Sequence, residues 1–132
     1  MIAWLLLSAQ LAPVATPEKP MVATIAAIRA NPSKFDGRLV RLTGWVNACQ
    51  PSSCAIDEHA ASAPGGAGQR LSVAEDKKFD GIIRPLLPTF VEFDARLNAE
   101  CPTAAVCSDP GPVLTIVTLR GVVSPEPPSF EN

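Results

Sequence analysis

Two sets of side chains in this sequence have types and spacing suited to chemistry, an acidic run ending in histidine and four cysteines. Asp57, Glu58 and His59 are consecutive, and carboxylate and imidazole groups can together hold a divalent metal. The run leads into a glycine-rich loop at residues 60–68, where ligands are hard to keep in a fixed geometry. A solvated polar loop is therefore the favoured interpretation, and a metal-dependent enzyme using these three residues is the alternative. No Ser-His-Asp set can be argued from a single loop histidine.

The cysteines form two locally spaced pairs, Cys49 with Cys54 and Cys101 with Cys107. An even count at such spacing is typical of disulfides in small exported domains, and four cysteines allow three connectivities. A zinc site built from all four thiolates is the chemical alternative, although its usual signature has tighter C-x2-C pairs. We expect two disulfides, no bound metal and no cofactor.

The start of the chain supports export. Residues 1–15 combine a short apolar run with small residues near Ala15, which is typical of a secretory signal peptide. The run is too short to cross a hydrocarbon core of about 30 Å as a helix, so we expect no membrane span. It has no basic residue before its apolar part, and Pro13 is unusual beside a cleavage site. A short N-terminal core segment is therefore the other interpretation. We expect cleavage of the signal and a periplasmic or extracellular protein.

The charge pattern argues against a polyanion as the partner. A net charge of −2 and a pI near 5.3 offer no basic surface for nucleic acid, and the chain has no tyrosine. Only Arg41 and Trp45, on the mixed face of the first long strand, could pair with a phosphate and stack on a base. They form the candidate binding face, and single-stranded nucleic acid is an alternative ligand. Glu92 and Asp94 share a strand face with Arg96, which is typical of a solvated surface rather than of catalytic carboxylates.

Hydrophobic periodicity predicts the elements that position these residues. We expect a helix over residues 21–29 that ends before Pro32, and a second helix over residues 76–87. Gly44 in the middle of the first strand marks the bend that a small barrel needs. The last strand is apolar on both faces for most of its length, whereas the fourth alternates cleanly. The five predicted strands are 38–49, 54–58, 70–73, 90–98 and 113–123.

Five strands with a helix between the third and the fourth is the arrangement of an OB-fold barrel. We therefore predict a mainly β domain over residues 16–123. It would be a five-stranded OB-fold-like barrel with a leading N-terminal helix and a helix between strands 3 and 4. Residues 124–132 are rich in proline and are predicted to be a disordered tail.

One stretch also carries a family resemblance. Residues 32–46 have the pattern PxxFDGxxVxxxGWV, which resembles the start of the first strand in small exported bacterial OB-fold proteins of unknown function. The likeness extends over most of residues 22–123, but its motif consists of turn and core residues. The resemblance implies the fold, a bacterial source, and a ligand or partner at the mouth of the barrel. It implies no particular activity.

The cysteine pairs suggest how such a mouth would be built. In an OB-fold, the loops after strands one and four flank the ligand face. These are the loops that carry the cysteines, so two disulfides would rigidify both rims and lower the cost of ordering them on binding. Simple stabilisation of a small exported domain explains the cysteines equally well. We expect a binding or structural module without enzymatic activity, whose partner is an unknown small ligand or protein.

Peptide mapping without a reductant tests the state of the cysteines. We expect Cys49, Cys54, Cys101 and Cys107 all to be recovered in disulfide-linked peptides, because an exported chain is oxidised in its compartment. Free thiols in the purified protein, or zinc released by a chelator, would contradict this expectation.

Overall fold

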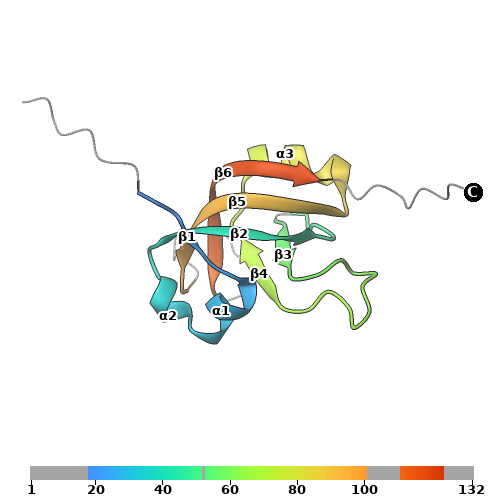
Figure 1. Cartoon of the computed structure of the whole chain (residues 1–132). Coiled ribbons are helices and arrows are strands. Elements are labelled where there is room, and N and C mark those ends of the chain that lie inside the picture. Colours follow the sequence, from blue (N-terminus) through green and yellow to red (C-terminus); the bar gives the residue numbers. More distant parts are fainter. Residues whose placement is uncertain (1–17, 52, 101–110, 124–132) are drawn as a thin grey trace, which may run out of the picture.

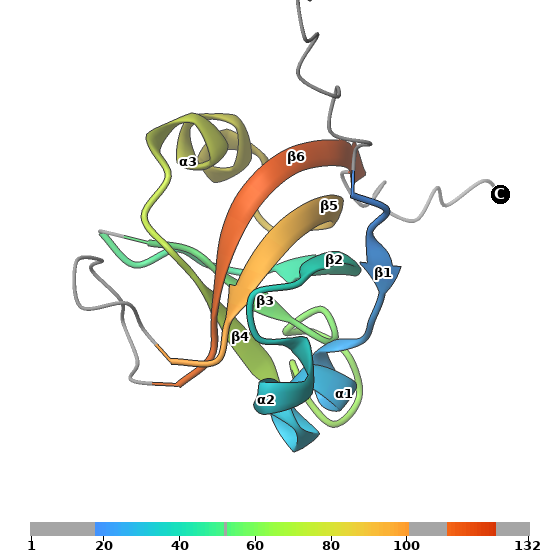
Figure 2. The same ribbon diagram turned by 90° about the vertical axis from the view of Figure 1, so that its left-hand side faces the viewer.

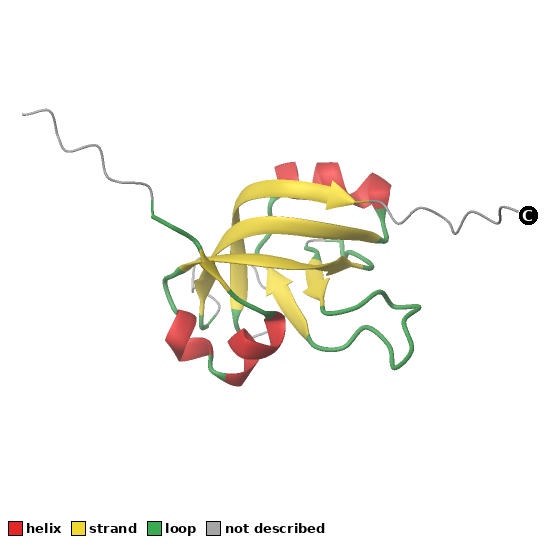
Figure 3. Ribbon diagram, viewed as in Figure 1, coloured by secondary structure: helices red, strands yellow, loops and turns green. Residues whose placement is uncertain are grey.

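The computed structural model describes residues 18–51, 53–100 and 111–123, and its dominant feature is a strongly curved β-sheet (Figure 1). The predicted signal segment, the second cysteine pair and the proline-rich tail lie outside the described residues. Short helices flank the sheet (Figure 3). Its strands are β1 (Met21–Val22), β2 (Leu39–Val46), β3 (Ala55–Asp57), β4 (Arg70–Val73), β5 (Thr89–Asn98) and β6 (Val113–Val123).

Five of these strands form a closed mixed barrel. The order in the sheet is β1-β2-β3-β4-β6-β5, and a further pairing of β2 with β5 closes the ring. The pairs are antiparallel except for β4 with β6, which is parallel, and β1, which runs parallel to β2 outside the ring. The predicted mainly β barrel is therefore confirmed at the level of class and closure.

The core lies inside this ring and follows the period-two pattern of the strands. Every second residue of β2 and β5 points inward, and these side chains are at most 1% exposed: Val40, Leu42, Val46, Val91, Phe93, Ala95 and Leu97. The same alternation places charged and aromatic side chains of both strands on the outer face.

The helices are short. They are α1 (Ile25–Ala30), α2 (Pro32–Phe35) and α3 (Lys77–Ile83), which continues into the 3-10 turn η1 (Arg84–Leu86). None of the helices within the described ranges has the length and apolar character needed to cross a membrane.

The first helix begins later than the expected residue 21. Met21 instead belongs to β1 and pairs with Val40 of β2. The Thr24 hydroxyl accepts the N–H of Ala27 at 3.1 Å, which starts α1 at Ile25. An apolar residue at position 21 fits a strand edge as well as a helix, and only the distant β2 decides between them.

Gly44 lies where β2 comes into close contact with β3 and α1. A Cβ at this position would lie 2.9 Å from the carbonyl oxygen of Asp57 and 3.3 Å from Cδ1 of Ile25, and would overlap Ile56. The contact with a backbone oxygen cannot be relieved by a rotamer change. This close packing therefore requires glycine here; in Figure 2, α1 lies below β2.

Substitution of Gly44 by alanine tests this close packing. We expect Gly44→Ala to lower the free energy of unfolding by about 1–3 kcal/mol, because the added methyl must push β3 away from β2. Urea denaturation measures the change. Gly121→Ala in β6 is the matched control, since a Cβ there meets no atom within 4 Å, and it should alter stability by less than about 1 kcal/mol. Equal effects of the two substitutions would contradict the packing argument.

Candidate functional site

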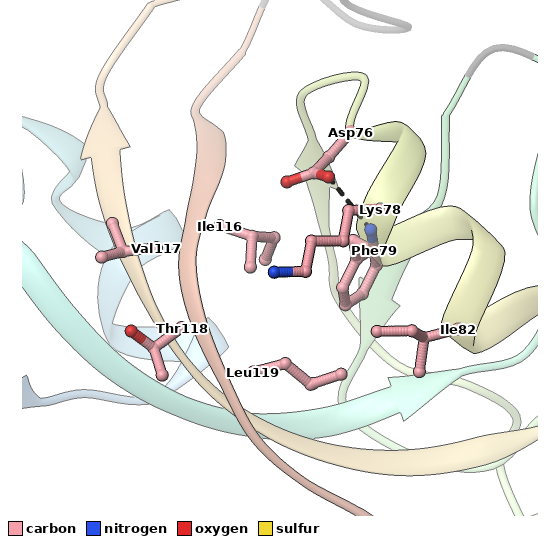
Figure 4. Close-up of a pocket in the computed structure, with 8 residues that line it drawn as sticks. All are labelled: Asp76, Lys78, Phe79, Ile82, Ile116, Val117, Thr118 and Leu119. Carbon is pink, nitrogen blue, oxygen red and sulfur yellow. Dashed lines mark hydrogen bonds between the residues drawn. The ribbon is translucent and has the colours of Figure 1, made fainter.

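A groove of about 310 Å³ lies between α3 and β6 (Figure 4). We call it the α3–β6 groove. Its lining is mostly apolar, with Asp76, Lys78 and Thr118 as the polar members. The lining residues are Asp76, Lys78, Phe79, Ile82, Ile116, Val117, Thr118 and Leu119.

The wall formed by α3 is set by the way this helix begins. The Asp76 carboxylate accepts the backbone N–H of Phe79 at 3.0 Å, which caps the first turn. Phe79 is 2% exposed and packs edge-on against Phe93 of the core, with ring centroids 6.5 Å apart. Ile82 lies three residues further along, on the same side of the helix, and remains 41% exposed in the groove.

The wall formed by β6 results from the way the barrel closes. β6 pairs with β4 only at Val113 and Leu114, and beyond them its described strand partner is β5 alone. A register irregularity between Asp94 and Ala95 of β5 leaves Val117 without a partner there, and its side chain is 55% exposed. The groove is therefore bordered by an apolar bulge and by a strand edge that no described strand covers.

Two side chains with opposite charges, Asp76 and Lys78, line the groove. The Lys78 side chain extends over the groove toward Ile116 (Figure 4) and forms no ion pair with any described residue. The neighbouring Asp76 carboxylate is engaged in capping the helix. Chemically, the groove can accept an apolar group whose end, or whose neighbour, is negatively charged.

Arg41 and Trp45, the candidate binding face from the sequence, lie on the outer face of β2 in cross-strand pairs. Arg41 donates from Nε and from its terminal nitrogen to the two oxygens of Asp94, at 2.8 and 3.2 Å. Trp45 packs edge-on against Phe90, with centroids 5.7 Å apart. Both partners lie opposite in the β2–β5 register. Asp94 therefore engages two of the three nitrogens of this guanidinium.

Glu92 and Asp94 belong to the same outer-face network. Glu92 accepts from Arg120 at 2.9 Å, and Arg120 also lies 3.9 Å from Asp94. The hydrogen bonds from Arg41 lower the pKa of Asp94 below its usual range, against the opposing effect of burial. Asp94 is thus held ionised beside a guanidinium, and each carboxylate has an arginine partner of its own, which does not suit a shared-proton pair.

Asp57 is a buried structural anion. It is 1% exposed, and it receives two hydrogen bonds from Arg70 at 2.7 and 3.3 Å. The side-chain amide of Asn47 donates a third at 2.9 Å. These contacts satisfy the carboxylate and fix the hairpin between β2 and β3.

Glu58 and His59 do not join Asp57 in a metal site. Because neighbouring residues along an extended chain point to opposite sides, Glu58 turns away from Asp57 and accepts the N–H of Gln69 at 2.6 Å. Within the parts of the chain that the structure describes, no group of three His, Cys, Asp or Glu side chains is placed to hold a metal ion. The geometry lends no support to the metal-dependent enzyme.

A disulfide joins Cys49 and Cys54 at the base of the loop between β2 and β3. This confirms that these two cysteines are oxidised and selects one of the pairings that the sequence left open. Cys101 and Cys107, the cysteines of the second predicted rim, lie outside the described residues.

No model of a protein family matches the chain, and no curated protein sequence is significantly similar to it.

The residues of the α3–β6 groove are not predicted as a site from the sequence. The available signal is the last strand, where apolar residues on both faces leave one face without a role in the core. Val117 is the clearest case, since it is apolar and points outward. Recognising it also requires knowing that α3 lies alongside this strand.

The pairing of Asp94 with Arg41 predicts a pH-dependent contribution to stability. Asp94→Asn should lower the free energy of unfolding at neutral pH, because the amide cannot form the charged pair. The folded-state pKa of Asp94 is lowered, so the contribution is present above its ordinary pKa of about 4 and is lost as pH falls through the lowered value. The difference between wild type and variant should therefore shrink in acid.

Urea denaturation at a series of pH values measures this difference. Glu92→Gln is the matched control, because Glu92 and Arg120 form a more exposed surface pair that should contribute little. A difference for Asp94→Asn that is independent of pH would show that the charge of Asp94 is not what stabilises the outer face.

Proposed function

We propose that this protein is an exported binding module built on an OB-fold barrel. The barrel order β2-β3-β4-β6-β5, closed by β2 with β5, supports the fold, together with α3 between the third and fourth barrel strands. The Cys49–Cys54 disulfide supports an oxidising compartment. The proposal gives Asp57, Glu58 and His59 no enzymatic role.

The ligand of this module is an extended, apolar segment of a partner protein, bound in the α3–β6 groove. The observation that carries this step is the exposure of Ile82 and Val117 beside the edge of β6, which no described strand covers. Free backbone groups at a strand edge recognise another extended chain, while neighbouring pockets select its alternate side chains.

The charge of Lys78 restricts the kind of partner segment further. Lys78 extends over the groove without an ion-pair partner among the described residues, so an acidic residue beside the apolar segment would complement it. The volume of about 310 Å³ is at the lower end of the range of about 300–1,000 Å³ that ligand pockets occupy. A short segment fits such a groove better than a large folded surface does.

Fluorescence anisotropy with designed peptides tests this function. The probes are fluorescein-labelled peptides of alternating valine and threonine that end in two glutamates, or in two lysines as the opposite-charge probe. We expect the acidic peptide to bind more tightly than the basic one. Ile82→Glu should weaken its binding at least tenfold, or about 1.4 kcal/mol, because a carboxylate would then occupy the apolar floor.

Leu86→Glu is the matched control, since Leu86 is similarly exposed on η1 but does not line the groove. It should leave peptide binding unchanged. Equal binding of both peptides, or equal loss in both variants, would contradict the proposal. Binding of an oligothymidine that weakens steeply with added salt would instead favour the nucleic-acid alternative.

A further inference from the structure

The Cys49–Cys54 disulfide has two sulfurs in different surroundings. Cys54 is 2% exposed and belongs to the core, whereas Cys49 is only partly buried at the start of the loop. The two residues also form an isolated antiparallel bridge across the hairpin. An external thiol can therefore reach Cys49 more readily than Cys54. Thiol–disulfide exchange uses such an asymmetry, because one sulfur is attacked by the external thiol and the other is displaced and later re-forms the disulfide.

A carboxylate lies against the buried sulfur. Oδ1 of Asp80, on α3, is 3.3 Å from Sγ of Cys54. In the disulfide this sulfur carries no hydrogen, so the contact gains nothing as a hydrogen bond while the bridge is intact. In the reduced protein the same distance suits an S–H···O hydrogen bond from Cys54 to Asp80. The arrangement therefore favours the dithiol form and places a base beside its buried thiol.

The loop between the cysteines is attached independently of the disulfide. Arg84 donates to the carbonyl oxygens of Gln50 and Pro51, at 2.6 and 3.3 Å, and also pairs with Asp80 at 3.5 Å. The backbone N–H of Gln50 donates to the Ser53 carbonyl at 2.8 Å. None of these bonds involves a sulfur atom, so they can hold the two thiols close enough to re-form the disulfide.

A small polar pocket of about 90 Å³ adjoins the disulfide. Cys54 is the cysteine that lines it, together with Ala48, Gln50, Arg70 and Ser72, whereas Cys49 lies between two lining residues without being one itself. Its size suits part of a small thiol compound rather than a protein segment.

We propose that Cys49–Cys54 is a reversible thiol–disulfide exchange site for a low-molecular-weight thiol and its disulfide. Cys49 is the sulfur that bonds to the external compound, Cys54 is the resolving cysteine, and Asp80 is the base that accepts the proton of Cys54. The site is separate from the α3–β6 groove and does not depend on the binding function proposed for it.

The exchange is balanced in both directions. An external thiolate bonds to Cys49, the Cys49–Cys54 bond breaks, and Cys54 receives the electron pair and takes up a proton. A second external thiol then releases Cys49, so that two thiols are oxidised to one disulfide as the protein is reduced. In reverse, the Cys49 thiolate attacks an external disulfide and releases one thiol. Cys54 then gives its proton to Asp80 and attacks Cys49, and the second thiol leaves.

The kinetics of reoxidation distinguish two steps: formation of the mixed disulfide at Cys49, which does not use Asp80, and its resolution by Cys54, which does. Reduced full-length protein is mixed with oxidised glutathione, quenched with acid, and analysed by peptide mapping and mass spectrometry. Formation of the mixed disulfide at Cys49 involves no proton of Cys54, so Asp80→Asn should leave its rate within about twofold of wild type. Resolution by Cys54 should be at least tenfold slower, and the mixed disulfide should accumulate.

Asp76→Asn is the matched control, because it changes a carboxylate of the same helix to an amide while asparagine still caps α3. It should resolve the mixed disulfide at the wild-type rate. In a second measurement, Cys54→Ser should form a lasting mixed disulfide at Cys49, and Cys49→Ser should react at Cys54 at least tenfold more slowly. Resolution at the wild-type rate in Asp80→Asn would overturn the role of Asp80. Equal reactivity of the two cysteines, or resistance of the native disulfide to excess glutathione, would overturn the exchange site.

Discussion

The barrel depends on one close contact, where β2 packs against β3 and α1 at Gly44. The absence of a side chain there lets the carbonyl of Asp57 and the side chain of Ile25 approach the same backbone position. Three elements therefore meet at a single residue: the leading helix α1, the first barrel strand and the following hairpin. β2 pairs with β5 along its whole length and with β3 beside Gly44, at Trp45 and Asp57. Its pairings with both strands close the ring, although β6 beyond Leu114 keeps β5 as its only described strand partner.

Much of the barrel can be predicted from the sequence because its strands are patterned locally. β5 alternates apolar and polar residues, and β2 has Val40, Leu42, Gly44 and Val46 on one face, so both strands and their inward faces are recognised without knowing their partners. The start of α1 could not be predicted in the same way. Whether Met21 extends a helix or pairs as a strand is decided by Val40, which only the folded chain brings beside it. Local periodicity contains no information about such a partner.

The candidate site illustrates the same limit more sharply. Arg41 and Trp45 stand out in the sequence because they are polar or aromatic on an outward face, and the sequence does not show that Asp94 and Phe90 lie opposite them. The register of β2 with β5 turns two apparent ligand groups into a cross-strand ion pair and an aromatic pair. The α3–β6 groove shows the reverse case. Its apolar residues resemble ordinary core residues in the sequence, and only the structure shows that β6 no longer pairs with β4 after Leu114 and that Val117 is exposed.

Helix α3 links the two surfaces to which function is assigned. It has only seven residues, which is too short to be stable as an isolated helix in water, so its position depends on its contacts. Phe79 anchors it in the core beside the groove, while Asp80 faces the Cys54 sulfur. Arg84, at its end, holds the carbonyls of the disulfide loop. The groove wall and the surroundings of the disulfide are therefore set by one element. A change in how the loop holds Arg84 therefore bears on the same helix that carries Ile82, beside the anchor that Phe79 provides.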